Sequence, residues 1–165
     1  MSYRRSVPRL LHDEHLETIA LLDRIDRVIL SRRDAPPPGE ADVDKTIRHM
    51  TSSMSANVPN HFGFEEETLF PFLAERGDVD IGVFLEEEHN LMRDVAAEII
   101  AIANGATTNG FDAKSWMEFR RLSAEWVERM MSHVQKEEMA LLPILEDALD
   151  ADSDSQLVAR YTESQ

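Results

Sequence analysis

The stretch HFGFEEETLFPFL at residues 61–73 has a close counterpart in HVQKEEMALLPIL at residues 133–145. Both stretches have the pattern His-x-x-x-Glu-Glu, and both then place leucine, proline and leucine at the same later offsets. Two looser matches, Glu14-His15 and Glu88-His89, precede them along the chain. The sequence therefore contains an internal repeat, in which a Glu-His segment is followed by a His-x-x-x-Glu-Glu segment.

Four segments have the periodicity of amphipathic helices, at about residues 7–33, 40–76, 81–103 and 112–150. Breaker residues separate them: a proline-rich linker at 34–39, Gly77 as a helix-ending residue, and a turn-rich loop at 104–110. This pattern predicts an all-α fold, an antiparallel up-down-up-down four-helix bundle over residues 1–150. Residues 151–165 are expected to form a polar C-terminal tail that is frayed or carries one loose turn.

Composition narrows the classes of function. The chain has 165 residues, no cysteine and a formal net charge of -15, so it fits one domain without disulfides, zinc–thiolate sites or iron–sulfur clusters. An acidic surface repels phosphate, which argues against nucleic acid and anionic membranes as partners. No apolar stretch is long enough to span a membrane and the first residues lack a signal-peptide pattern, so the cytoplasm is the expected location. The oligomeric state is not predicted.

The spacing within each repeat suits metal binding. In a helix, His61 and Glu65 lie one turn apart and roughly 40° apart around the axis, and His133 and Glu137 have the same relation. An imidazole nitrogen binds one ion, whereas a carboxylate has two oxygens and can bridge two ions. Such a set of nitrogen and oxygen ligands suits iron, and also manganese or zinc.

The same residues are predicted to face the core. His61 and Glu65 share a helical face with Met50 and Met54, and His133 and Glu137 share one with Trp126. His15 and His89 also lie on apolar faces. A single histidine on such a face is usually a hydrogen-bonded core residue, but unpaired carboxylates almost never face a core. Four histidines and two glutamates in one bundle indicate a buried cation.

The remaining candidate ligands fit this cluster less well. His49 is predicted to be a surface histidine, and His12, at the margin of its face, a helix-end residue or a support for a ligand. Glu66 and Glu138 point away from their histidines and are expected on a solvated face. Glu86 lies three residues before His89 and is a minor candidate.

Taken together, these motifs resemble the hemerythrin-like (HHE cation-binding) family over about residues 8–150. The resemblance implies an antiparallel four-helix bundle with two non-haem iron ions joined by an oxo or hydroxo bridge. Carried over to this chain, it implies six metal ligands: His15, His61, Glu65, His89, His133 and Glu137.

Two positions depart from the oxygen-carrying members of that family. Those proteins have a fifth histidine one turn before the position of His89, where this chain has Leu85. Their last carboxylate is an aspartate one position later than Glu137. A smaller set of histidines leaves more positions open on the metal ions, so a reversible oxygen carrier is not the expected role.

Two kinds of function are therefore predicted. In the first, the chain binds or senses a small diatomic ligand such as O2 or NO, or handles iron. In the alternative, it is a di-iron redox enzyme that acts on hydrogen peroxide or nitric oxide; both need an open coordination position. A third interpretation is an interaction bundle whose metal residues are vestigial. A ferritin-like site would need two Glu-x-x-His motifs, and only one is present, at Glu86–His89.

Overall fold

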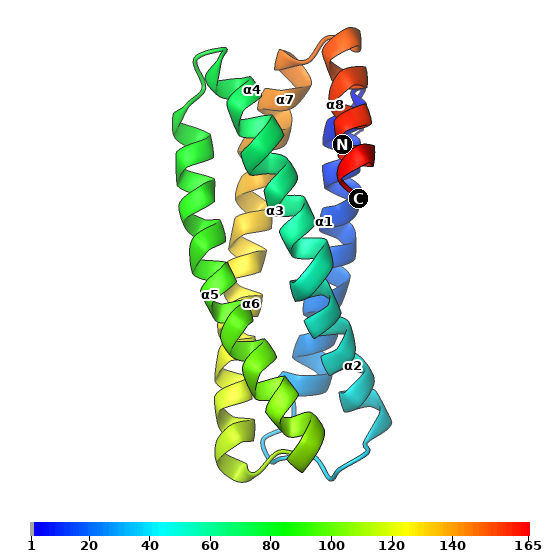
Figure 1. Ribbon diagram of the computed structural model, residues 1–165, viewed down its shortest axis with the longest axis vertical. Helices are drawn as coiled ribbons and strands as arrows, with labels where there is room; N and C mark the ends of the chain where they lie inside the picture. The colour runs from blue at the N-terminus through cyan, green and yellow to red at the C-terminus, as the bar shows by residue number, and fades with distance from the viewer. Residues whose placement is uncertain (1) are drawn as a thin grey trace.

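The computed structural model describes residues 2–165, and within that range it contains helices and no strand. Four long helical segments lie side by side and successive segments run in opposite directions, with both chain ends at one end of the bundle (Figure 1). The prediction of an all-α helical bundle is confirmed. The four segments comprise α1 (Ser6–Ile25) with η1 (Asp26–Leu30), α2 (Ala41–Ser52) to α4 (Phe70–Ala74), α5 (Asp80–Asn109), and α6 (Ala113–Lys136) to α7 (Leu142–Ala148).

The second and fourth segments are continuous helices with π-helical turns inserted. The second contains η2 (Ser53–Asn57), α3 (Val58–Phe64) and η3 (Glu65–Leu69), and the fourth contains η4 (Glu137–Leu141). Each of these three π-turns ends two residues before a proline, at Pro59, Pro71 and Pro143. A proline lacks the N–H that an α-helix needs and crowds the preceding turn, so the hydrogen bonds shift to the wider π pattern. Two of the π-turns begin at Glu65 and Glu137.

Glycines with positive φ mark three of the connections. Gly39, Gly77 and Gly110 have φ of 79°, 96° and 71°, values that side chains with a Cβ rarely adopt. The prediction of Gly77 as a helix-ending residue is confirmed. The predicted loop at 104–110 is wrong, because α5 continues to Asn109 and only Gly110 leaves the helix. A helix tolerates an internal glycine such as Gly105 at a cost of about 1 kcal/mol, so it need not end there.

The core consists of two apolar clusters with a polar layer between them. Along α1, Val7 and Leu11 belong to one cluster and Leu22 and Ile25 to the other. His15 lies between these pairs and is buried. The same order recurs in the fourth segment, where buried His133 and Glu137 separate an apolar cluster around Trp126 from one around Leu145. Polar side chains this deep in a bundle need compensating partners.

The expectation of a frayed polar tail is wrong. Residues 151–164 form α8 (Ala151–Ser164), whose first turn is closed by a capping box between Asp150 and Ser153. The carboxylate of Asp154 accepts hydrogen bonds from the backbone N–H groups of Ser6 and Val7, at 2.8 and 2.9 Å, and so caps the beginning of α1. Leu157 is buried in the apolar cluster at that end. The helix has few apolar residues, but it still docks on the bundle, because Asp154 binds backbone groups near the N-terminus of the chain.

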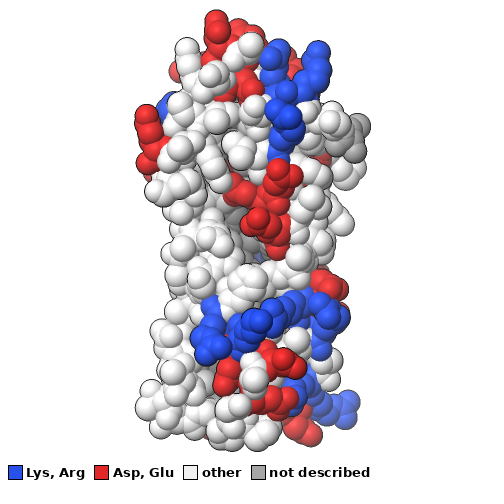
Figure 2. Space-filling view, turned by 90° about the vertical axis from the view of Figure 1, so that its right-hand side faces the viewer, with Lys and Arg blue, Asp and Glu red and all other residues white. Residues whose placement is uncertain are grey.

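Charge is unevenly spread over the face that carries α1 and α8. Lysine and arginine side chains form a band across the lower half of this face, and acidic side chains gather above and below the band (Figure 2). No helix within residues 2–165 is long and apolar enough to cross a membrane.

Candidate metal centre

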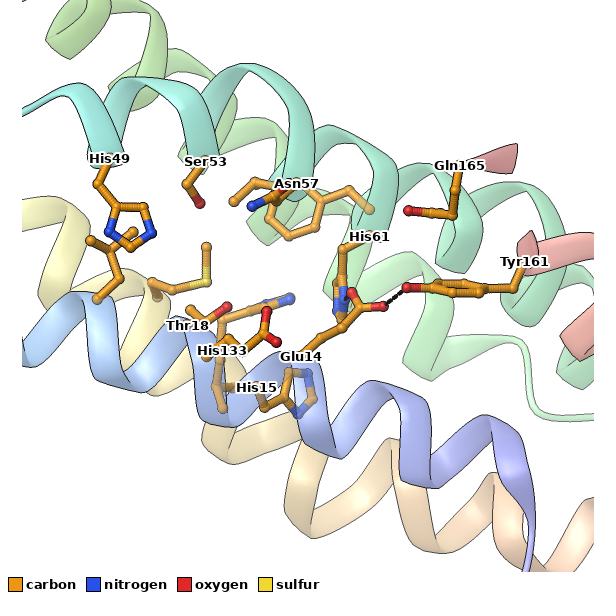
Figure 3. Close-up of a pocket in the computed structure, with 16 residues that line it drawn as sticks. Glu14, His15, Thr18, His49, Ser53, Asn57, His61, His133, Tyr161 and Gln165 are labelled. Atoms are coloured by element: carbon orange, nitrogen blue, oxygen red, sulfur yellow. Dashed lines mark hydrogen bonds and ion pairs between the residues drawn. The ribbon is translucent and has the colours of Figure 1, made fainter. Parts of the chain in front are cut away.

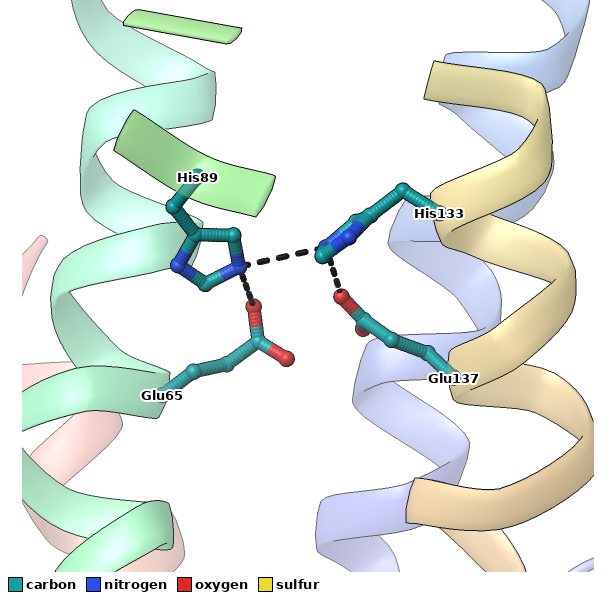
Figure 4. A group of neighbouring side chains, drawn as sticks. All are labelled: Glu65, His89, His133 and Glu137. Carbon is teal, nitrogen blue, oxygen red and sulfur yellow. Dashed lines mark hydrogen bonds and ion pairs between the residues drawn. The ribbon is translucent and has the colours of Figure 1, made fainter. Parts of the chain in front are cut away.

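The six residues predicted as ligands lie together in the polar layer. One group consists of Glu65, His89, His133 and Glu137, all buried, whose donor atoms lie within 4.8 Å of one another (Figure 4). Within this group the Nε2 atoms of His89 and His133 are 3.1 Å apart, and Glu137 Oε1 contacts His133 Nε2. The second group consists of His15, His61 and Glu137.

We call the six residues of these two groups the inner cluster, and each of its two glutamates reaches both groups. Glu137 does so with one oxygen on each side: Oε1 faces His133, and Oε2 lies 2.9 Å from His15 Nε2 and 3.5 Å from His61 Nε2. Glu65 Oε1 lies 3.1 Å from His61 Nε2 and 3.5 Å from His89 Nε2. Both carboxylates therefore occupy positions from which they can bridge two ions.

A second set of glutamates surrounds the histidines from outside. The Nδ1 atom of each histidine faces one carboxylate: His15 faces Glu138 at 2.7 Å and His61 faces Glu14 at 2.8 Å. In the other half of the site, His89 faces Glu66 at 3.3 Å and His133 faces Glu88 at 2.9 Å. We call Glu14, Glu66, Glu88 and Glu138 the outer glutamates.

The outer glutamates form a closed cycle around the bundle. Each helical segment supplies one of them to the histidine of the next segment, and the fourth supplies Glu138 to His15 of the first. In the first and third segments the outer glutamate precedes the histidine, whereas in the second and fourth it follows the inner glutamate. Successive segments run in opposite directions. These two arrangements therefore place every outer glutamate on the same rotational flank of its helix, the side that faces the next segment around the bundle.

The expected solvated face for Glu66 and Glu138 is therefore wrong. A residue 100° away from the core-facing direction lies on the flank of its helix. A side chain on that flank meets the neighbouring helix before it reaches water. A glutamate side chain is long enough to reach across that flank. Glu14 and Glu88 were not among the predicted site residues, although each directly precedes a histidine of the cluster, His15 or His89, in the sequence.

The outer glutamates fix the state of the imidazoles. An ionised carboxylate only accepts hydrogen bonds, so each Nδ1 donates its proton outward and the neutral ring presents the Nε2 lone pair to the centre. The centre then holds four lone pairs and two carboxylates, which repel one another. Within residues 2–165, both oxygens of Glu65 and Oε1 of Glu137 have no hydrogen-bond partner. Buried acceptors without donors need a cation among them.

The pKa values show the same shortage of positive charge. Burial raises the pKa of the Glu65 carboxyl above its usual value, and the nearby Glu137 carboxylate raises it further. Burial lowers the pKa of His61, but the charge of Glu65 and hydrogen bonds with carboxylates outweigh this effect and hold that pKa well above its ordinary value. Burial and the neighbouring His133 lower the pKa of His89 to about 4. In the absence of a metal ion, protons must take its place.

The donor set fits first-row metal ions. Two atoms that bind one ion at about 2.1 Å and at a right angle lie about 3 Å apart, which agrees with the 3.1 Å between the Nε2 atoms of His89 and His133. Imidazole nitrogens with carboxylate oxygens suit iron, manganese or zinc. Histidine ligands that donate their other N–H to a carboxylate are typical of metal sites, where this bond orients the ring and raises its basicity.

A cavity of about 260 Å³ opens beside His15 and His61 (Figure 3). Part of its wall is apolar, with Leu21, Val58, Phe62 and Met130 among the lining residues. The rest is polar and includes Thr18, His49, Ser53, Asn57 and Tyr161. The ring of Phe62 stacks on His89 with 3.8 Å between centroids and shields that histidine, whereas His133 also lines the cavity. The cavity therefore offers a small ligand access to the His15–His61 side.

The minor candidates occupy different places. His12 Nδ1 lies 3.0 Å from both oxygens of Glu138, so it supports the outer glutamate of His15 and does not reach the centre. His49 is exposed, as predicted, although it also lines the far end of the cavity. Glu86 is exposed and belongs to neither group of candidate ligands. Leu85 is buried in an apolar cluster, where the oxygen carriers would have a histidine.

Comparison with protein families agrees with this geometry. The model of the hemerythrin HHE cation binding domain matches residues 6–145, a span that begins at α1 and ends within α7. Comparison with curated proteins gives no match. The matched span contains all six inner residues and all four outer glutamates, and it leaves out α8. This chain therefore belongs to the hemerythrin HHE cation-binding family.

Proposed function

We propose that this protein holds two non-haem iron ions at the inner cluster and uses them to bind a small ligand. His15 and His61 would bind one ion, His89 and His133 the other, and Glu65 and Glu137 would bridge them. The observation that carries this proposal is the set of inner carboxylate oxygens that have no donor while four imidazole nitrogens face them. Iron in such a site would supply Lewis acidity and a redox couple.

The ligand is proposed to be O2, NO or peroxide, bound or sensed on the side of His15 and His61. The cavity is lined by both His15 and His61 but, of the other pair, by His133 alone, which favours entry on the side of His15 and His61. The protein's own contribution is to orient the imidazoles through the outer glutamates and to cover His89 with the ring of Phe62. Storage or handling of iron is a further role that this cluster permits.

The polarity of the cavity favours the enzymatic alternative, a redox enzyme that acts on hydrogen peroxide. O2 forms only weak hydrogen bonds and gains little from a polar wall, whereas peroxide both donates and accepts. Thr18, Ser53 and Asn57 line the cavity and offer hydroxyl and amide groups to such a ligand. Nitric oxide stays the second substrate class of this alternative.

Anaerobic purification followed by metal analysis tests the proposal. We expect two iron ions per chain after loading with ferrous iron, and a change in the visible spectrum on addition of O2, NO or peroxide. A stable adduct would support binding or sensing, and sustained release of O2 from peroxide or consumption of NO would support the enzyme. A folded chain that retains no iron, manganese or zinc would overturn the metal site and leave the vestigial bundle.

The domain boundary near residue 150 stays a proposal, and so do the ligand roles of the six residues. The expected cytoplasmic location also stays a prediction.

A further inference from the structure

The last helix of the chain is in contact with the metal centre through one side chain. Tyr161 of α8 is half-buried, its ring packs edge-on against Phe64 with 5.1 Å between centroids, and it lines the cavity beside His61. Its hydroxyl group donates a hydrogen bond to Glu14 Oε1 (Figure 3). The other oxygen of Glu14 faces His61 Nδ1 at 2.8 Å. A continuous chain of hydrogen bonds thus leads from α8 to a candidate ligand.

Glu14 differs from the other outer glutamates in its second partner. Glu66 also binds the guanidinium of Arg93 at 2.7 Å, Glu88 also binds the ammonium of Lys136, and Glu138 also faces His12. In those three pairs a nitrogen group holds the outer side of the carboxylate. At Glu14 the corresponding group is a neutral phenol, because burial and the nearby Glu14 carboxylate raise the pKa of Tyr161 above its usual value.

We propose that Tyr161 is a positioning residue for His61, acting through Glu14, and that α8 is thereby a working part of the site for the ion held by His15 and His61. This inference rests on the proposed metal centre and concerns only one of its two ions. It goes beyond the family resemblance, because α8 lies outside the matched residues 6–145.

Two physical effects follow from the hydrogen bond. It restrains Glu14, which would otherwise be free to turn toward the cavity, and so keeps the carboxylate aligned with His61 Nδ1. It also withdraws less negative charge from Glu14 than a cation would. The glutamates of His89 and His133 are held by the cations Arg93 and Lys136, so His61 stays the stronger electron-pair donor to a metal ion. Loss of a direct partner of a ligand costs about 10–100-fold in metal affinity, and one step further out we expect about three- to tenfold.

The test uses the full chain and Tyr161→Phe, which removes only the hydroxyl. Stepwise affinities for Zn²⁺, measured by competition with a chelator, should show one ion bound about three- to tenfold more weakly and the other unchanged. In the Zn²⁺-loaded protein, NMR of ¹⁵N-labelled histidine should show a shifted His61 Nδ1 resonance and an unchanged His133 resonance. Lys136→Met, which removes the partner of Glu88, should shift His133 and leave His61 unchanged.

Two control variants separate positioning from simple loosening of α8. Thr162→Val removes an exposed hydroxyl that bonds only to its own helix, and should match the wild type. Leu157→Ala weakens the docking of α8 but keeps the phenol, and should lower the melting temperature with a smaller loss of affinity than Tyr161→Phe. Unchanged affinities and an unchanged His61 resonance in Tyr161→Phe would overturn the inference, and so would an equal loss in Leu157→Ala. Absence of metal from the wild type would overturn the proposed function as well.

Discussion

The Nε2 atoms of His89 and His133 lie 3.1 Å apart, while the Nδ1 atom of each ring faces a carboxylate, Glu66 in one case and Glu88 in the other. Two neutral rings arranged in this way place two lone pairs against each other in the interior of the bundle. The contact is stable only with a positive charge between or beside the rings. A metal ion would supply that charge for both histidines together, and the first predictions below depend on it.

Glu65→Gln and Glu137→Gln should each reduce bound metal from two ions per chain toward one, or abolish binding. An amide keeps the shape of the side chain but loses the charge and one good oxygen donor, so it cannot bridge. Metal per chain, measured after loading and desalting, decides the outcome. Glu67→Gln is the matched control, since Glu67 is exposed and belongs to neither group of candidate ligands, and it should retain two ions.

Glu66→Gln and Glu138→Gln should weaken metal binding by about 10–100-fold without changing the number of sites. These variants keep the inner donors but replace the carboxylates that face His89 Nδ1 and His15 Nδ1. Titration with a competing chelator measures the affinity, and saturating metal measures the capacity. A reduced capacity at saturation would show that these glutamates bind the ions directly and that the assignment of inner and outer residues is wrong.

Removal of metal should destabilise the fold. An ion present at about 100 times its dissociation constant adds about 2.7 kcal/mol to the free energy of unfolding, which corresponds to about 5–10 °C in melting temperature for a chain of this length. Thermal melts followed by circular dichroism, before and after chelation, measure the difference. Equal melting temperatures for verified metal-loaded and metal-free protein would contradict a buried, charged cluster.

Substitution of two glycines should have opposite effects. A Cβ on Gly82 would lie 2.9 Å from the Cβ of Phe70, so Gly82→Ala should force α5 away from α4 and cost about 1–3 kcal/mol. Gly63 has no such neighbour within 4 Å, so Gly63→Ala should stabilise its helix by about 1 kcal/mol. Chemical denaturation of the two variants provides the comparison. Stabilisation by Gly82→Ala would show that the contact between these helices is looser than described.

Protonation of Asp150 at low pH should destabilise the first turn of α8, which this residue caps. Hydrogen bonds from the backbone and side chain of Ser153 lower the pKa of Asp150 below its usual value of 3.8. When folding lowers the pKa of a carboxyl group, its stabilisation of the fold is fully present at pH values above the pKa of the unfolded state. The stabilisation is lost as the pH falls through the pKa of the folded state. NMR titration should place the Asp150 midpoint below 3.8, with loss of the Ser153 amide shift in the same range. In Asp150→Ala, α8 should already show faster amide exchange near neutral pH.

The helices and the proximity of the six inner residues could be predicted from the sequence, for a physical reason. Candidate ligands such as His61 and Glu65 are one turn apart on one helix, so their proximity depends only on local geometry. The convergence of four helices then follows from the apolar faces that carry these residues. The end of α5 was misplaced because glycines at 105 and 110 look alike in sequence, and only Gly110 has a positive φ.

Contacts between helices were not predictable in the same way. The pairing of Glu14 with His61 and of Glu138 with His15 depends on which helices are neighbours, and periodicity within one helix carries no such information. The helical tail was missed for a similar reason. Asp154 and Tyr161 form hydrogen bonds with Ser6 and Glu14, which lie near the other end of the sequence.

The cycle of outer glutamates also has a rotational direction around the bundle axis, which can be compared with the handedness of the bundle. Four antiparallel helices can be arranged with the second to the right or to the left of the first, and an apolar core alone distinguishes poorly between these mirror arrangements. Here each glutamate lies on one rotational flank and reaches only the neighbour on that side. In the mirror arrangement each carboxylate would instead face the histidine of the preceding segment, so that Glu14 would lie beside His133 and not beside His61. Which histidine each outer glutamate supports is therefore a consequence of the order of the helices around the axis, and the connections between the segments must select that order.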